Sequence, residues 1–209
     1  MIYLKDTCVL IEQFDTLELI RVASIYKDTN DVFALTDIII DELYPGKSVN
    51  ECDAEKSKNL LAGINILEES NLLETYSVKS EGKYKDNFNK IRRAFYGHLK
   101  DPKFVKEALA KGEITREQFR SRTYIYKDYG ECSCIAVAVE NPKDIVIISN
   151  DKGRIFLKPN INLFDKYREL NNIQVFNYEE WKKKIDDITK DGEQAQWYIS
   201  VLSIEVSKS

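Results

Sequence analysis

The stretch Ile145-Val146-Ile147-Ile148-Ser149-Asn150-Asp151 decides the fold class of this chain. Its apolar run is short, rich in β-branched residues and followed by turn residues, which predicts a buried strand over 145–149. Two shorter runs also read as strands: Met1–Leu4, which ends at Lys5-Asp6, and Val32–Leu35, which is followed by Thr36-Asp37. Continuous apolar strands of this kind are typical of a sheet that is covered on both faces.

Helical patterns separate these strands along the chain. The expected helices lie within 7–25 and over Ile38–Leu43, Asp53–Ser70, Tyr84–Leu99, Pro102–Lys111, Gly130–Glu140 and Tyr178–Ile188. One more is expected to open with a capping box at Thr115 and Gln118, and another to start within Lys152–Leu157. A further strand is expected at Ile173–Phe176, and Leu72–Val78 is expected to be a strand or an extended exit. Strands that alternate with helices predict an α/β domain with a mainly parallel sheet.

Length and composition place the chain among globular proteins. Its 209 residues suit one domain, or one domain with a long insertion, and 43% of them are apolar and 32% charged. No segment approaches the ~18 consecutive apolar residues of a membrane-spanning helix. The N-terminal MIYLKDTC lacks the pattern of a secretory signal, so the expected location is cytoplasmic, with no membrane partner.

The chain has few residues that could carry out thiol or imidazole chemistry. The four cysteines do not have the spacing of a disulfide framework or a zinc site, and they read as reduced core residues: Cys8, Cys52, Cys132 and Cys134. His98 is the one histidine, and we expect it at the surface. Hydrolytic chemistry in this chain therefore has to come from carboxylates.

Charge is distributed unevenly. Residues 77–127 carry 14 Lys and Arg against 6 Asp and Glu, a net +8, whereas the rest carries 17 against 29, a net −12. This pattern fits a polyanion-binding arm beside an acidic centre, or simply a solvated helical hairpin. The candidate phosphate contacts are Arg92, Arg93, Lys100, Arg116, Arg120 and Arg122. Aromatic candidates for base stacking are Tyr84, Phe95, Tyr96, Tyr124 and Tyr126, although aromatics at helical spacing more often belong to a core.

Four acids are expected at one edge of the sheet, where ligands bind in open α/β folds. Asp6 and Asp151 follow strands directly, and Glu42 and Glu131 lie on helices that begin near that edge. Converging carboxylates repel one another and are tolerated around a hard cation such as Mg²⁺ or Mn²⁺. Open alternatives are Asp128 in place of Glu131, Asp41 or Asp37 in place of Glu42, and a helix-capping role for Asp6. Thr7 and Ser149 either bond to the ligands or serve the local turns.

In their order along the chain, these motifs resemble a PIN-domain ribonuclease, the fold of VapC-type toxins. The similarity rests on Asp6-Thr7 with the apolar stretch behind it, the helix from Thr36 to Glu42-Leu43, the Gly130-Glu131-x-x-x-Ile135-Ala136-x-Ala138 pattern of one branch, and Ser149-Asn150-Asp151 at a strand end. It covers about 1–76 and 128–188. Residues 77–127 and the tail after 188 depart from the compact toxins.

The resemblance implies a three-layer α/β/α domain over 1–188, interrupted by a basic helical insertion at 77–127 and followed by a tail at 189–209. It implies a metal-dependent endoribonuclease in which Asp6, Glu42, Glu131 and Asp151 are catalytic residues and hold Mg²⁺ or Mn²⁺, with 3′-hydroxyl and 5′-phosphate products. Its biological role would be that of a toxin or a defence nuclease. RNA is the implied substrate, and an antitoxin, another regulatory protein or a second copy of the chain remains open as a partner.

Two other classes of function compete with this interpretation. One is a catalytically silent PIN-like module that binds nucleic acid or regulates another protein. The other is a phosphatase-type hydrolase with Asp6 as nucleophile, but that chemistry usually requires a second Asp two residues on, where this chain has Cys8. Metal-dependent degradation of RNA separates the nuclease from both.

Overall fold

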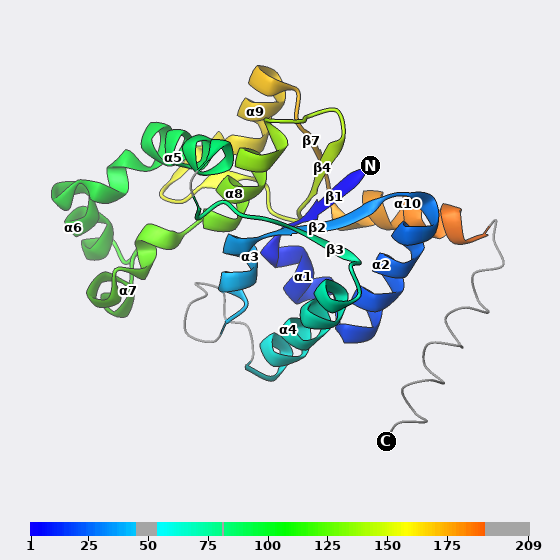
Figure 1. Ribbon diagram of the computed structural model, residues 1–209. Coiled ribbons are helices and arrows are strands. Elements are labelled where there is room, and N and C mark those ends of the chain that lie inside the picture. Colours follow the sequence, from blue (N-terminus) through cyan, green and yellow to red (C-terminus); the bar gives the residue numbers. More distant parts are fainter. Residues whose placement is uncertain (45–53, 81, 191–209) are drawn as a thin grey trace.

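A five-stranded sheet forms the centre of the molecule (Figure 1). The structure is a computed structural model that describes residues 1–44, 54–80 and 82–190. The strands lie in the order β3-β2-β1-β4-β7, and each neighbouring pair is parallel. Their bounds are β1 Ile2–Lys5, β2 Val32–Thr36, β3 Leu73–Tyr76, β4 Ile145–Ile148 and β7 Gln174–Phe176. The predicted α/β fold with a mainly parallel sheet is confirmed.

The strand order creates a switch point beside β1. From β1 the chain proceeds to β2 on one side, and it returns later to β4 on the other side. Ile2 pairs with Val32 of β2 and with Ile145 of β4, so β1 lies between them. Ligands of open α/β sheets bind at the carboxyl ends of strands next to such a point. A ligand site is therefore expected in the segments that follow β1 and β4.

Helices cover both faces of the sheet (Figure 1). One layer contains α1 Thr7–Gln13, α2 Thr16–Thr29, α4 Ala54–Glu69 and α10 Tyr178–Lys190. The opposite layer contains α5 Lys83–Tyr96 and α8 Tyr129–Ala138, with the short α3 Asp37–Glu42 against α8. None of the helices within the described ranges is both long enough and apolar enough to cross a bilayer.

Helix α8 is enclosed because its sequence has no polar face. All of its residues from Cys132 to Ala138 are buried. The hydroxyl of Ser133 bonds to that of Thr36 at 2.7 Å and donates to the Gly130 carbonyl at 2.7 Å, so it is satisfied inside the core. Of the four cysteines, the three that the structure describes are free thiols, two of them buried in this helix.

The basic segment 77–127 is helical, as expected. After α5 it contains η1 Gly97–Lys100, α6 Pro102–Ala110, α7 Arg116–Ser121 and η2 Thr123–Tyr126. Both bonds of the expected capping box at Thr115 and Gln118 are present. The segment is not simply an appended arm, because α5 buries Phe88 and Ile91 on the side of α8. Helices α6 and α7 lie farther from the sheet (Figure 1).

The expected helix at 152–157 is wrong. That region forms an antiparallel pair, β5 Arg154–Ile155 with β6 Lys158–Asn162, and the helix α9 begins only at Leu163 and ends at Asn171. Gly153 has a positive φ of 65°, and a Cβ there would lie 2.5 Å from the Phe164 ring. A turn that needs glycine therefore replaces the first turn of the expected helix. The tail is described only to residue 190, as the end of α10, and its remainder lies outside the described residues.

Lys5 is completely buried at the end of β1, which the sequence did not suggest. Its ammonium lies 3.4 Å from the Trp181 ring centroid and donates to the Tyr26 hydroxyl at 3.2 Å. Tyr3 and Phe33 complete the aromatic surroundings, with centroids 5.4 and 5.6 Å away. No carboxylate among the described residues pairs with it. Burial therefore lowers the pKa of Lys5 well below its usual value.

Replacing Lys5 with Met should stabilise the protein at pH 7 by about 1–4 kcal/mol, because an unpaired buried ammonium gives way to an apolar side chain of similar length. The unfolded chain binds the Lys5 proton more tightly than the folded chain, so the wild type should gain stability as pH rises toward the unfolded pKa of about 10.4. Burial raises the pKa values of Tyr3 and Tyr26, so both phenols stay neutral over most of this range. Thermal unfolding from pH 7 to 10 checks this: the advantage of Lys5→Met should shrink at the high end. A variant that is less stable throughout would mean that the aromatic rings more than compensate for the lost hydration.

Candidate functional site

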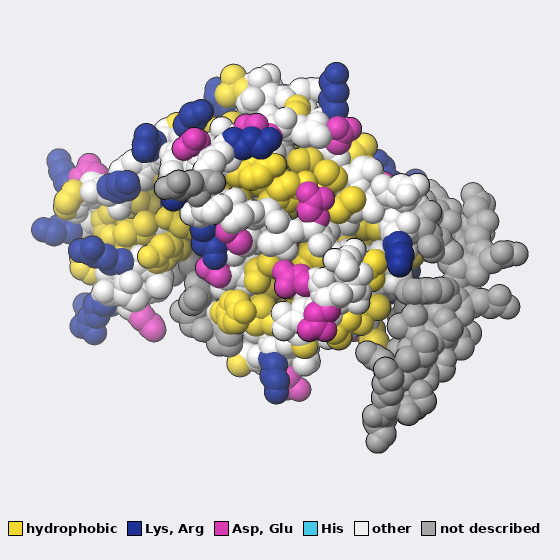
Figure 2. Space-filling view, in the orientation of Figure 1, with side chains coloured by type: hydrophobic (Ala, Val, Ile, Leu, Met, Phe, Trp, Pro, Cys, Tyr) yellow, Lys and Arg dark blue, Asp and Glu magenta, His cyan; other side chains and the backbone are white. Residues whose placement is uncertain are grey.

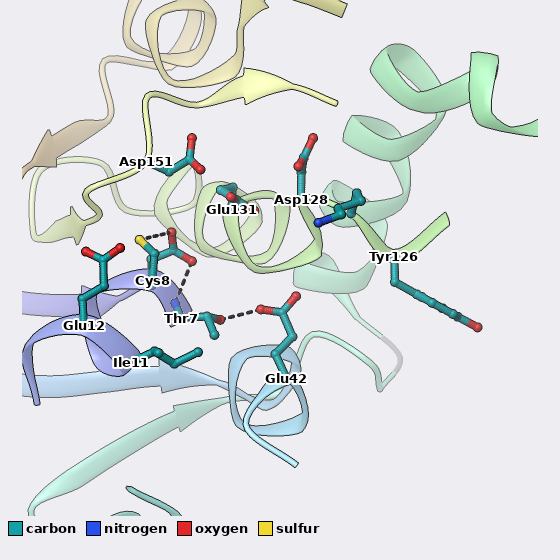
Figure 3. Close-up of a pocket in the computed structure, with 11 residues that line it drawn as sticks. Thr7, Cys8, Ile11, Glu12, Glu42, Tyr126, Asp128, Glu131 and Asp151 are labelled. Carbon is teal, nitrogen blue, oxygen red and sulfur yellow. Dashed lines mark hydrogen bonds between the residues drawn. The ribbon is translucent and has the colours of Figure 1, made fainter. Parts of the chain in front are cut away.

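A cavity of about 560 Å³ opens at the carboxyl ends of β1 and β4 (Figure 3). It lies at the switch point of the sheet, and most of its lining is polar. The lining residues are Asp6, Thr7, Cys8, Ile11, Glu12, Glu42, Tyr126, Lys127, Asp128, Glu131 and Asp151. All four acids that the sequence favoured lie on this one cavity, which we call the carboxylate cavity.

Asp6 is fixed in place by hydrogen bonds from three directions. It follows β1 and is 2% exposed. Its carboxylate accepts bonds from the Thr7 backbone N–H at 2.8 Å, the Ser149 hydroxyl at 2.7 Å and the Cys8 thiol at 3.3 Å. Burial raises the pKa of Asp6 and these donors oppose the rise, while the charge of Asp151 adds to it. The result is an oriented carboxylate whose charge is poorly solvated.

Glu42 lies at the end of α3, and its carboxylate and that of Asp6 converge beside Gly130. One carboxylate oxygen accepts a bond from the Thr7 hydroxyl and the other from the Gly130 backbone N–H at 3.1 Å. Burial raises its pKa to about 7, and the neighbouring charge of Asp6 contributes to the shift. Thr7 thus connects the two carboxylates, since its N–H bonds to one and its hydroxyl to the other (Figure 3).

The two acids that competed with Glu42 have other partners. The carboxylate of Asp37 accepts bonds from the Ser77 hydroxyl and from the backbone N–H groups of residues 78 and 79, so it holds the exit from β3. Asp41 forms an ion pair with Lys79 at 2.8 Å. Of these three acids, only Glu42 lines the carboxylate cavity.

Because Gly130 has no side chain, the first turn of α8 can lie close to Asp6, Thr7 and Glu42. A Cβ at this position would lie 2.9 Å from Glu42 Oε2, 3.0 Å from Asp6 Oδ1 and 3.2 Å from the Thr7 hydroxyl. Three oxygen atoms from two elements therefore converge on one point beside the first turn of α8. A side chain here would push the two carboxylates apart.

Glu131 and Asp128 both belong to the cavity, so the choice between them is not exclusive. Burial raises the pKa of Glu131 well above its usual value, and the charges of Asp6, Asp128, Asp151 and Glu42 raise it further. No described side chain or backbone group donates a hydrogen bond to its carboxylate. Asp128 differs, because one of its oxygens accepts from the Tyr96 hydroxyl at 2.8 Å and from the Phe156 N–H at 2.7 Å. Asp128 thus also anchors the local structure.

Asp151 is exposed and is placed by the turn after β4. Its N–H donates to the Ser149 hydroxyl at 3.1 Å, and its carboxylate accepts from the Gly153 N–H at 2.8 Å. Since the same Ser149 hydroxyl donates to Asp6, one side chain positions acids from two strands. Thr7 and Ser149 therefore bond directly to the acid cluster.

Glu12 lines the cavity, and the sequence gave no reason to choose it. Its carboxylate accepts a bond from the Asn150 side chain at 3.0 Å. The spacing of Cys8, Ile11 and Glu12 was the available signal, because positions i, i+3 and i+4 share one helix face and all three line the cavity. Lys127 was missed for a different reason, since the fold of the basic segment brings it there together with Tyr126, which the sequence offered as a stacking candidate.

The donor chemistry suits a hard divalent cation. Six carboxylates line the cavity, and none of the ion pairs within the described ranges involves them. Carboxylate oxygens are the ligands preferred by Mg²⁺ and Mn²⁺. No three of these side chains in the described chain are already gathered closely enough to form a ready metal cluster. The fit therefore rests on the unpartnered Glu131 and on the convergence of Asp6 and Glu42 beside Gly130.

Arg92 is occupied by the structure itself. Its guanidinium donates to the backbone carbonyls of Lys127 at 2.8 Å and Ile125 at 2.7 Å. It also lies over the rings of Tyr96 and Tyr129, at 3.6 and 4.4 Å from their centroids. These contacts hold η2 and the start of α8 against α5, which leaves Arg92 poorly placed to contact a phosphate.

The other candidate phosphate contacts are all exposed: Arg93, Lys100, Arg116, Arg120 and Arg122. Figure 2 shows Lys and Arg side chains gathered over α5, α6 and α7. Lys100, Arg120 and Arg122 line a cavity of about 500 Å³ between α6 and η2, together with Lys106. We call Arg93, Lys100, Arg120 and Arg122 the basic set.

His98 is not a free surface residue, contrary to expectation. Its Nε2 is 3.0 Å from the Phe156 carbonyl oxygen, and its ring packs edge-on against Phe104. Burial lowers its pKa. His98 does not line the carboxylate cavity, so it belongs to the packing of the basic segment.

Comparisons with protein-family models, with curated proteins and with solved structures give no match.

Proposed function

We propose that this protein is a metal-dependent endoribonuclease that hydrolyses RNA phosphodiester bonds in the carboxylate cavity. The observation that carries the proposal is the gathering of Asp6, Glu42, Glu131 and Asp151 from four separate segments on one cavity at the switch point of the sheet. The order of the motifs, which resembles the PIN-domain ribonucleases, supports the same activity. The cavity is lined by no histidine, and burial raises the pKa of its one thiol, that of Cys8, which suits hydrolysis by water.

The acids of the cavity would act together as ligands of a divalent cation. Asp6, Glu42, Glu131 and Asp151 would hold Mg²⁺ or Mn²⁺, with Asp128 as a further oxygen donor. When bound, such a cation supplies Lewis acidity, lowering the pKa of water and offsetting charge on the phosphate. Ser149 and Thr7 fix the orientation of Asp6 and Glu42 through their hydroxyl groups. Such supporting bonds are worth about 10- to 100-fold in metal affinity or activity.

The direct test is incubation of the purified protein with an end-labelled single-stranded RNA in Mg²⁺, in Mn²⁺ and in EDTA. Internal cleavage that requires the metal, with 3′-hydroxyl and 5′-phosphate ends, is the expected result. RNA that is bound but never cut would instead favour the silent nucleic-acid-binding module. If the protein neither cuts nor binds the RNA, the result would argue against any nucleic-acid ligand. A biological role as a toxin or a defence nuclease is part of the proposal and needs growth assays with cleavage-dead controls.

Replacing the basic set with Gln should weaken RNA binding for all sequences about equally, because backbone contacts carry charge and little sequence information. Each lost contact with single-stranded RNA should flatten the slope of log affinity against log salt by roughly 0.7. A salt series of filter-binding measurements in an Asp151→Asn background checks the prediction without substrate loss. Arg92 is left intact, since its loss would disturb η2.

The control replaces four exposed cations of the acidic body, Lys58, Lys143, Lys166 and Lys183, with Gln, which makes the same change in net charge. If both sets lower affinity and slope equally, the effect is one of overall charge. If replacing the basic set has no effect on affinity or slope, this surface does not bind RNA. The alternative is then that it binds a protein partner such as an antitoxin.

A further inference from the structure

A second cavity of about 330 Å³ lies directly beside the carboxylate cavity. Its lining residues are Ile38, Asp41, Glu42, Val78, Lys79, Lys85, Phe88, Asn89, Tyr126 and Tyr129. We call it the side cavity. Two of its residues, Glu42 and Tyr126, also line the carboxylate cavity, so the two spaces share a wall.

The side cavity combines an apolar floor with one available aromatic ring. Ile38, Val78 and Phe88 are buried beneath it. Tyr126 is 50% exposed and meets Tyr129 edge to face, with centroids 5.2 Å apart. Figure 3 shows Tyr126 at the opposite end of the carboxylate cavity from Glu12, with its ring directed away from Thr7. The exposed part of the Tyr126 ring is therefore accessible to a flat apolar ligand.

Tyr126 is the most exposed of the five aromatic residues that the sequence offered as stacking candidates. Tyr96 and Tyr124 are buried. Tyr84 packs edge-on against Tyr76, and Phe95 packs against Tyr167. These four rings are buried or half-buried, whereas Tyr126 is half exposed, which leaves Tyr126 as the candidate of that group for stacking on a ligand.

Polar groups at the rim suit a nucleotide. The Asn89 side chain has no hydrogen-bond partner among the described residues, and its amide can both donate to and accept from the edge of a base. Lys85 forms no ion pair with a described carboxylate, so its ammonium is available to a phosphate. The charge of Asp41 is offset by Lys79 at 2.8 Å, which reduces its repulsion of a polyanion.

We propose that the side cavity receives the base next to the phosphodiester held over the carboxylates, and that this base stacks on Tyr126 with its edge toward Asn89. This inference rests on the proposed function and specifies its substrate class. A base inside a duplex is already stacked and paired, and its extrusion costs energy, so the side cavity favours a base that is unpaired at the outset. The substrate is therefore unpaired RNA: a single strand or a loop.

The experiment places 2-aminopurine, a base analogue whose fluorescence is quenched by stacking, at one position at a time along a short single-stranded RNA. The protein is the full chain with Asp151→Asn, in Mg²⁺, and an end label reports overall binding by anisotropy. The expected result is strong quenching at one position. Tyr126→Ala should abolish that quenching and weaken binding by roughly 5- to 150-fold. Tyr126→Phe, which keeps the ring, should retain both.

The outcomes separate this inference from the proposed function. RNA that binds with the same quenching in Tyr126→Ala and its parent overturns the side-cavity inference alone, and so does duplex RNA that binds as tightly as the single strand. A chain that fails to bind RNA overturns both. Thermal unfolding of Tyr126→Ala shows whether the fold is retained. If the fold is lost, Tyr126→Leu removes the ring but keeps an apolar side chain. The same fluorescence measurement on Tyr126→Leu then tests the inference.

Discussion

Asp6→Asn and Asp151→Asn should each lower the rate of RNA cleavage by roughly 100-fold or more, and neither should unfold the protein. Loss of a residue that merely supports a metal ligand costs about 10- to 100-fold, so loss of a ligand should cost at least as much. The carboxamide keeps the shape of the side chain and removes its charge. The rate is measured under single-turnover conditions with saturating protein, so that weaker binding does not imitate slower chemistry.

The stability of these variants provides an independent check. Asp6 is buried, and burial raises its pKa, so its charge costs free energy in the folded state without metal. Asp6→Asn should therefore unfold in EDTA at the same temperature as the wild type or higher. Glu169→Gln is the matched control, since it removes one exposed carboxylate from α9, outside the cavity. Full activity in a folded Asp6→Asn or Asp151→Asn variant would refute the assignment of the site.

The sequence predicted the sheet well because its interior strands have few alternatives. Ile145–Ile148 is buried at every position, and only a run of apolar β-branched residues satisfies that environment. The error at 152–157 has a tertiary cause. Gly153 adopts a positive φ where the Phe164 ring closes over it, and Phe164 is eleven residues farther along the chain. The start of the next helix is set here by a tertiary contact. The local sequence pattern therefore cannot show at which residue that helix begins.

The site was predictable to the extent that it depends on strand ends. Asp6 and Asp151 follow adjacent parallel strands, so topology alone brings them to one edge. The role of Arg92 was not predictable, because its partners are backbone carbonyls about 35 residues away that the fold of η2 presents. Lys5 was equally hidden, since its aromatic surroundings come from β1, β2, α2 and α10. The sequence therefore indicated the acids of the cavity, but it could not show which Lys and Arg side chains are held by contacts within the fold.

Mg²⁺ or Mn²⁺ should raise the unfolding temperature of the wild type substantially. A ligand that binds only the folded state at 100 times its Kd adds about 2.7 kcal/mol of stability. For a chain of this size that corresponds to roughly 5–11 °C, and relief of repulsion among buried carboxylates is the physical source. Asp6→Asn should remove most of this increment, while Glu169→Gln should retain it. An equal shift in all three proteins would mean that the cations bind elsewhere.

The pH dependence of this metal effect tests whether Glu42 takes part. Its pKa is raised to about 7, whereas a Glu in the unfolded chain titrates near 4.3. Without metal the folded state holds this proton between these values, so the contribution of Glu42 to stability should fall as pH rises from about 4 to 8. A cation must displace the same proton, so metal stabilisation should be larger at pH 8 than at pH 6. Glu42→Gln should reduce both trends, as measured by thermal unfolding with EDTA and with Mg²⁺ across that range. Glu131, whose pKa burial also raises, accounts for part of the dependence that is left. If the metal increment in the wild type does not change with pH, protons and metal do not compete at Glu42, and this residue is not a ligand.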